Sequence, residues 1–89
     1  MFESERQKVL GDIDREFQLA TRAHKPLNSL HEAWAVIREE VDELWEEVRK
    51  KPEARDWAQI YQELIQIAAM AMRLVLDVCD PKIAARLQP

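Results

Sequence analysis

The chain has 89 residues, 47% of them hydrophobic, and a formal net charge of −4 at pH 7, which suits one small domain over residues 1–89 with a thin core. Its single glycine and four prolines, together with the lack of strict two-residue alternation, argue against a β-rich fold and predict an all-α one. The acidic balance, without a basic face, argues against polymeric nucleic acid as a partner.

The first predicted helix runs from about Ser4 to Ala23. Ser4 and Gln7 have the spacing of a capping box. Apolar residues then recur at steps of three and four, at Val9, Leu10, Ile13, Phe17 and Ala20. The segment 24–28 is expected to end this helix, because Pro26 disfavours helical backbone in the residue before it.

The second predicted helix begins at another capping box, formed by Ser29 and Glu32. One face of this helix carries an apolar stripe that is centred near Val41, and we expect the stripe to be core. Its members are Trp34, Ile37, Val41, Leu44, Trp45 and Val48. Pro52 is expected at the first position of the next helix, where proline is well tolerated.

The third predicted helix runs from about Pro52 to Cys79 and becomes almost wholly apolar over its second half. A helix that is apolar on every side is buried on every side. We therefore expect its own chain to cover one side and a second copy to cover another, in a dimer or a larger assembly. Polar residues interrupt the run before the roughly 20 apolar residues that a bilayer needs, so no membrane partner is expected.

Asp80 is expected to cap a short final helix that has Pro81 at its first position. The predicted fold is thus a helical bundle of three main helices plus a short C-terminal helix. The tryptophans are expected in the core or in an interface; they are Trp34, Trp45 and Trp57.

In its otherwise apolar second half, the third predicted helix carries its polar residues in one narrow stripe, which comprises Glu63, Gln66, Arg73 and Asp77 together with Met70. A buried carboxylate is costly unless it finds a partner or a metal. On the second helix Glu40 and Glu43 lie three residues apart and point the same way. If the two sets face each other, three carboxylates converge and a divalent cation relieves their repulsion. Oxygen ligands favour Mg²⁺, with Mn²⁺ as the alternative.

Each of these features also has a purely structural explanation. An acidic run such as 39–47 is most often a solvated helix face. Glu63 and Gln66 can form a buried hydrogen-bonded pair that fixes helix register at a dimer interface. Arg73 and Asp77 have the spacing of an ion pair within one helix.

Two short acidic motifs stand in order along the chain, Glu39-Glu40-Val41-Asp42-Glu43 and Glu63-Leu64-Ile65-Gln66. They resemble the signature of the MazG-like, all-α nucleoside triphosphate pyrophosphohydrolases, which is E-E-x-x-E on one helix and E-x-x-D on the next. Gln66 stands where that family has its aspartate. The resemblance covers about half of the chain, from about residue 31 to residue 77.

The resemblance implies magnesium-dependent hydrolysis of a nucleoside triphosphate, such as a non-standard nucleotide, to a monophosphate and pyrophosphate. It also implies assembly as a homodimer or homotetramer. The residues it assigns are Glu40, Glu43 and Glu63 as metal ligands, Gln66 as a weaker ligand, Glu39 as an adjacent ligand or a base that orients water, and Arg73 and Lys82 as candidates for binding phosphates.

Two other functions remain open. One is a family member that has lost catalysis and keeps the helical scaffold for nucleotide binding or for pairing with another protein. The other is a structural helical module whose acidic face is only solvated. The single cysteine, Cys79, and an N-terminal segment without a hydrophobic signal region lead us to expect a cytoplasmic location.

Overall fold

The computed structural model describes residues 2–79, which contain no strand and three α-helices. The helices are α1 (Glu3–Ala23), α2 (Leu30–Val48) and α3 (Trp57–Leu74). A 3₁₀ turn at Pro52–Ala54 precedes α3, and a π-helical turn at Val75–Cys79 follows it. The all-α prediction is confirmed for this part of the chain. The expected final helix from Asp80 and the candidate residue Lys82 lie outside the described residues.

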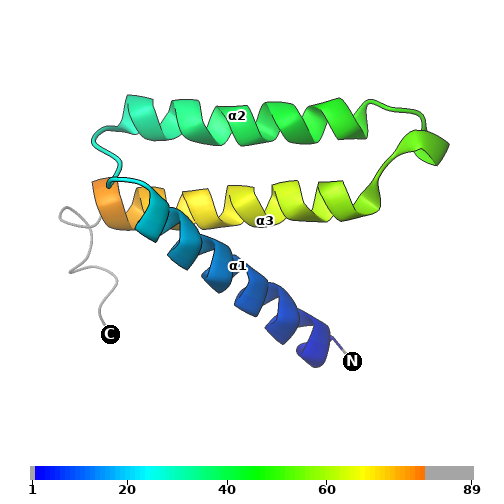
Figure 1. Ribbon diagram of the computed structural model, residues 1–89, viewed down its shortest axis with the longest axis horizontal. Coiled ribbons are helices and arrows are strands. Elements are labelled where there is room, and N and C mark those ends of the chain that lie inside the picture. The colour runs from blue at the N-terminus through cyan, green and yellow to red at the C-terminus, as the bar shows by residue number, and fades with distance from the viewer. Residues whose placement is uncertain (1, 80–89) are drawn as a thin grey trace.

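Helix α3 is the central element. It lies antiparallel to α2 and beside it, and α1 crosses it obliquely (Figure 1). The Tyr61 hydroxyl on α3 donates a hydrogen bond to the Asp12 carboxylate on α1, which also accepts one from Lys8. This cluster ties the two crossing helices together. Within residues 2–79 no helix has the length and apolar character that crossing a bilayer demands.

The predicted start of α2 is confirmed in its details. Ser29 is the N-cap residue, and its hydroxyl accepts the Glu32 N–H at 3.1 Å. The Glu32 carboxylate accepts the Asn28 N–H at 3.0 Å. The reciprocal bond of the capping box is therefore made, one residue before the cap itself.

The predicted cap of α1 is wrong. The helix begins at Glu3, and Phe2 occupies the cap position without any side-chain bond. The Ser4 hydroxyl donates to Glu5 instead of accepting a backbone N–H. With acidic residues already in its first turn, α1 has a favourable interaction with the helix dipole that does not depend on Ser4.

The predicted start of α3 at Pro52 is also wrong. Pro52 opens only the 3₁₀ turn, and α3 begins five residues later, at Trp57. The cause is Asp56, whose carboxylate accepts the N–H groups of Ala58 and Gln59 at 3.0 and 3.2 Å. Aspartate is among the strongest N-cap residues, so the helix starts where this cap is available.

The connection between α1 and α2 is held by the end of α3. Leu27 is buried beside Ala33 and Met70, and its N–H donates to the Asp77 carboxylate at 2.9 Å. The Arg73 guanidinium donates to the Lys25 carbonyl at 2.9 Å and lies 3.8 Å from Asp77. The expected ion pair within the helix is thus present, and both of its members also hold the connection.

The face of α2 that was expected to be core is largely exposed. Trp34 and Trp45 are 58% and 56% exposed, and Val41, the centre of the predicted stripe, is 40% exposed. The inward face is displaced toward the polar flank and consists of Ala33, Val36, Ile37, Glu40, Leu44 and Glu47. A helical wheel identifies the apolar arc of a helix, but the neighbouring helix decides which part of that arc is covered.

The inward face of α3 agrees better with the sequence. Glu63, Met70 and Arg73 are buried, and Gln66 and Asp77 are half-buried, so the predicted polar stripe does face the interior. The expectation that α3 is buried on every side is not met within one chain, where the opposite side is open to solvent. The exposed apolar residues of α3 include Leu64 and Met72, and Leu76 of the following turn is exposed as well.

Candidate metal centre

Three carboxylates converge between α2 and α3. Glu40, Glu43 and Glu63 each offer one oxygen, and these oxygens all lie within 4.8 Å of one another. Glu40 and Glu43 are neighbours on the inward flank of α2, because residues three apart on a helix project from one side. Glu63 reaches them from the inward stripe of α3. The cluster lies within a single chain and needs no second copy to form.

Glu63 is the most buried member of the cluster. Its residue is 3% exposed, and Gln59 donates a hydrogen bond to Glu63 Oε1 at 2.6 Å. Glu63 Oε2 is buried and has no hydrogen-bond partner among residues 2–79; the same holds for Glu40 Oε2. Buried carboxylate oxygens almost always find a donor or a cation. Both of the oxygens without a partner belong to the acidic cluster.

The electrostatics of the cluster reflect its crowding. Burial, with the nearby Glu63 carboxyl and the charges of Glu43 and Glu39, raises the pKa of Glu40 to about 7. The close approach of the Glu63 carboxyl, together with its charge, raises the pKa of Glu43. These are the effects of like charges held close together, which at Glu40 are added to the effect of burial. A cation bound between the three carboxylates would replace their mutual repulsion with attraction to the ion.

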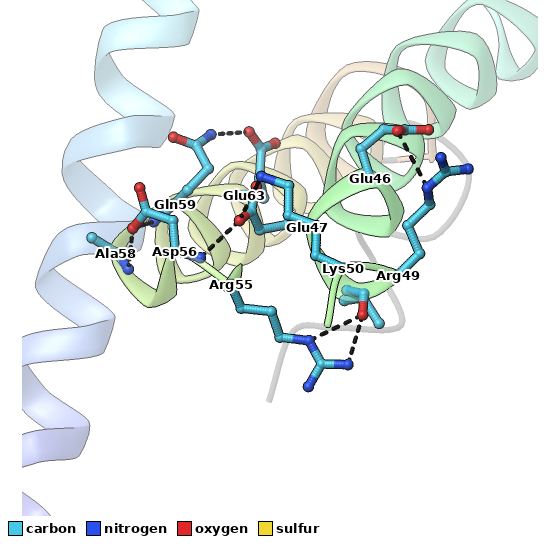
Figure 2. Close-up of polar contacts among 10 residues, drawn as sticks. Glu46, Glu47, Arg49, Lys50, Arg55, Asp56, Ala58, Gln59 and Glu63 are labelled. Carbon is cyan, nitrogen blue, oxygen red and sulfur yellow. Dashed lines mark hydrogen bonds and ion pairs between the residues drawn. The ribbon is translucent and has the colours of Figure 1, made fainter. Parts of the chain in front are cut away.

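The connection between α2 and α3 sets the relative position of the carboxylates. Glu47 accepts two hydrogen bonds from the Lys50 ammonium at 2.9 and 3.0 Å and one from the Asp56 N–H at 2.7 Å. Figure 2 shows these bonds beside the pair formed by Gln59 and Glu63. Nearby, Arg55 donates to the Val48 carbonyl at the end of α2. The end of one helix is thereby fastened to the beginning of the next.

A cavity of about 470 Å³ opens beside the cluster, within the usual size range of small-molecule sites. Glu40 belongs to both the cluster and the cavity wall, and Gln66 and Glu39 line the same wall. Arg73 lines the cavity about 15 Å further along α3 than Glu63. Apolar side chains form much of the remaining wall: Ala20, Leu27, Val36, Ala69 and Met70.

The predicted site residues thus fall into groups. Glu40, Glu43 and Glu63 meet in the cluster, Gln66 and Glu39 stand beside it on the cavity wall, and Glu39 is itself exposed. Arg73 belongs to the cavity and to the helix connection, not to the cluster.

The sequence interpretation missed two residues that hold this arrangement. Gln59 stands four residues before Glu63, a spacing at which helical side chains meet, so its role could have been found. Glu47 had no such signal, because its partners lie in an irregular connection.

The fold and the site together define a small all-α domain with an acidic cluster between two antiparallel helices. Comparison of the chain with protein-family models, curated proteins and solved structures gave no match.

Proposed function

We propose that this protein is a magnesium-dependent nucleoside triphosphate pyrophosphohydrolase that converts its substrate to a monophosphate and pyrophosphate. The observation that carries the proposal is the convergence of Glu40, Glu43 and Glu63, with a nearly fully buried Glu63 oxygen that has no partner among the described residues. The order and spacing of the two acidic motifs support the same activity.

The cluster has the donor set that a hard divalent cation takes. It offers oxygen atoms alone, carries negative charge, and leaves two buried oxygens to be satisfied. Glu40, Glu43 and Glu63 would hold the ion, and Gln66 would add a neutral oxygen. A magnesium ion bound there supplies positive charge for phosphate oxygens and lowers the pKa of a bound water. Glu39, which is exposed at the edge of the cavity, would orient the attacking water.

The cavity supports a particular orientation of the substrate. The phosphates belong at the carboxylate end, and the nucleoside belongs further along α3, among the apolar side chains and toward Arg73. Arg73 is buried and already donates to the Lys25 carbonyl. Its position therefore suits the nucleoside end of the cavity better than the phosphates.

The second candidate function is a helical scaffold that binds nucleotides or another protein and no longer hydrolyses them. Gln66 favours it, because an amide is a weaker magnesium ligand than a carboxylate. The two candidates predict opposite effects of Gln66→Asp on turnover. A gain points to a weakened site, whereas a loss means that the amide suits the reaction.

The decisive experiment incubates the purified protein with a panel of standard and non-standard nucleoside triphosphates and Mg²⁺, and identifies the phosphorus products. Monophosphate and pyrophosphate are expected, and Glu63→Gln should abolish their release. Glu46→Gln is the matched control, because Glu46 is exposed, lies outside the acidic cluster and pairs with Arg49 at 3.7 Å. If the folded protein hydrolyses no nucleotide, the proposed activity is wrong.

We further propose that the protein works as a homodimer or homotetramer in the cytoplasm. The support for self-association is the amount of apolar surface that one chain leaves open. Residues 2–79 bury six hydrophobic residues, whereas fourteen large ones are exposed. Surface of this kind is uncommon on a monomer.

A further inference from the structure

The outer side of α2 carries five large apolar residues in one stripe. They are Leu30, Trp34, Val41, Trp45 and Val48, with exposed fractions of 60, 58, 40, 56 and 36%. Their spacings of four, seven, four and three residues bring them to one side of the helix. We call this surface the α2 apolar face.

The α2 apolar face lies roughly 100° around the helix from the side that contacts α3. The half-buried Ile37 and Leu44 stand between the two. The apolar arc of α2 is therefore continuous and wider than one neighbouring helix covers. The carboxylates of the acidic cluster point to α3, so whatever covers the α2 apolar face does not block them.

The face is large enough for a specific interface. Trp34 and Trp45 expose 58% and 56% of their surface, which for side chains of up to about 250 Å² amounts to roughly 280 Å². That is more than half of the ~500 Å² that each partner gives to a minimal specific interface. Leu30, Val41 and Val48 extend the area along the helix. Tryptophans in such positions are the residues that usually dominate association.

Two further features distinguish the ends and the middle of the face. A shallow hollow of about 210 Å³ lies at the N-terminal end of the face, between Leu30, His31 and Trp34, while the exposed Trp45 lies near the C-terminal end. At the middle of α2, Arg38 donates to Asp42 at 3.0 Å, and both side chains are more than half exposed.

We infer that the α2 apolar face binds the same face of a second copy of this chain, with the two α2 helices antiparallel about a two-fold axis near residues 38–41. Each Trp45 then meets the hollow beside the partner copy's Trp34, and each Arg38 lies near the other copy's Asp42. A parallel pairing places hollow against hollow and Arg38 against Arg38. Charge and shape therefore both favour the antiparallel arrangement.

The first test measures association by sedimentation. The double variant Trp34→Gln/Trp45→Gln should weaken dimerisation about a hundredfold or more. Trp57→Gln is the matched control, because Trp57 is 67% exposed on α3 and lies outside the face; it should associate as the unchanged protein does. A monomeric unchanged protein, or a double variant that dimerises normally, would overturn the inference.

The second test leaves both tryptophans in place and determines whether the two α2 helices are antiparallel. In a background with Cys79→Ser, the single variants Leu30→Cys and Val48→Cys are oxidised separately and as a mixture. In the antiparallel pair, equal positions at residue 30 are separated by about 28 Å along the axis, too far for a disulfide. Only the mixture should form a covalent dimer. Cross-linking of Leu30→Cys with itself, or none in the mixture, contradicts the inference.

Discussion

Replacing Glu63 with glutamine should make the metal-free protein more stable and its response to magnesium smaller. The amide keeps the shape of the side chain, and its oxygen still accepts the hydrogen bond from Gln59. What it removes is one of three negative charges whose oxygens lie within 4.8 Å of one another. Glu63→Gln should therefore raise the stability of the metal-free protein but reduce the stability gained from Mg²⁺. Measurements with and without the ion separate these two effects.

The size of the effect follows from the geometry. Two unit charges 4.8 Å apart repel by about 3.5 kcal/mol at an effective dielectric constant of about 20. Glu43 is exposed and Glu40 is partly protonated near neutrality, so the free energy of unfolding should rise by about 1–2 kcal/mol. That corresponds to an increase of roughly 5–10 °C in Tm for a domain of this size. At a magnesium concentration ten times its Kd, the unchanged protein should gain about 1.4 kcal/mol.

The assay is thermal unfolding followed by circular dichroism at pH 8, with and without Mg²⁺. Glu46→Gln, outside the cluster, should unfold as the unchanged protein does in both conditions. The raised pKa of Glu40, about 7, supplies a second control. A raised pKa means that protonated Glu40 stabilises the folded protein at low pH and that this stabilisation is lost as the pH rises through 7. At pH 5.5 Glu40 is largely uncharged, so Glu63→Gln removes less repulsion and should raise the free energy of unfolding by less. A variant that is less stable without the ion, or that responds to Mg²⁺ as fully as the unchanged chain, refutes the reasoning.

Three other changes test neighbouring parts of the structure. Gln66→Asp should raise magnesium affinity about tenfold, because a charged ligand replaces a neutral one; titration calorimetry measures this, and unchanged affinity means that residue 66 does not reach the ion. Ala20→Leu should narrow the cavity and raise the KM for a nucleotide without changing the response of Tm to Mg²⁺, whereas an unaltered KM places the nucleoside elsewhere. Glu47→Gln should lower the urea midpoint at pH 7. The Lys50 ammonium and the Asp56 N–H lower the pKa of Glu47, so this loss should vanish as the pH falls below 4.

The sequence predicted best what depends on neighbouring residues. The start of α2 follows from Ser29 and Glu32 alone, and the inward stripe of α3 follows from the spacing of Glu63, Gln66 and Arg73. The meeting of the carboxylates needed one more condition, that α2 and α3 be adjacent and antiparallel. A short connection of eight residues, 49–56, makes that the expected arrangement.

The sequence did not predict which face of α2 is turned toward α3. The apolar arc of α2 is wider than one neighbouring helix covers, and Val41 at the centre of that arc is 40% exposed. The bonds from Glu47 to Lys50 and to the Asp56 N–H fix the end of the helix, and they arise in an irregular segment without a periodic signal. A helical wheel could not predict the cavity either, because the cavity wall combines residues of three helices with the connection at residues 24–29.

The bonds that join residues 25 and 27 to residues 73 and 77 also have a consequence for folding order. They span 48 and 50 positions of the chain. The connection between α1 and α2 is therefore held in place only after the end of α3 has formed. A fragment that ends before residue 73 keeps all three cluster carboxylates but lacks both fastenings. We expect such a fragment to retain helical content and the bond from Tyr61 to Asp12 while the path of the segment 24–29 varies, and the 89-residue chain to fold as one cooperative unit instead of helix by helix.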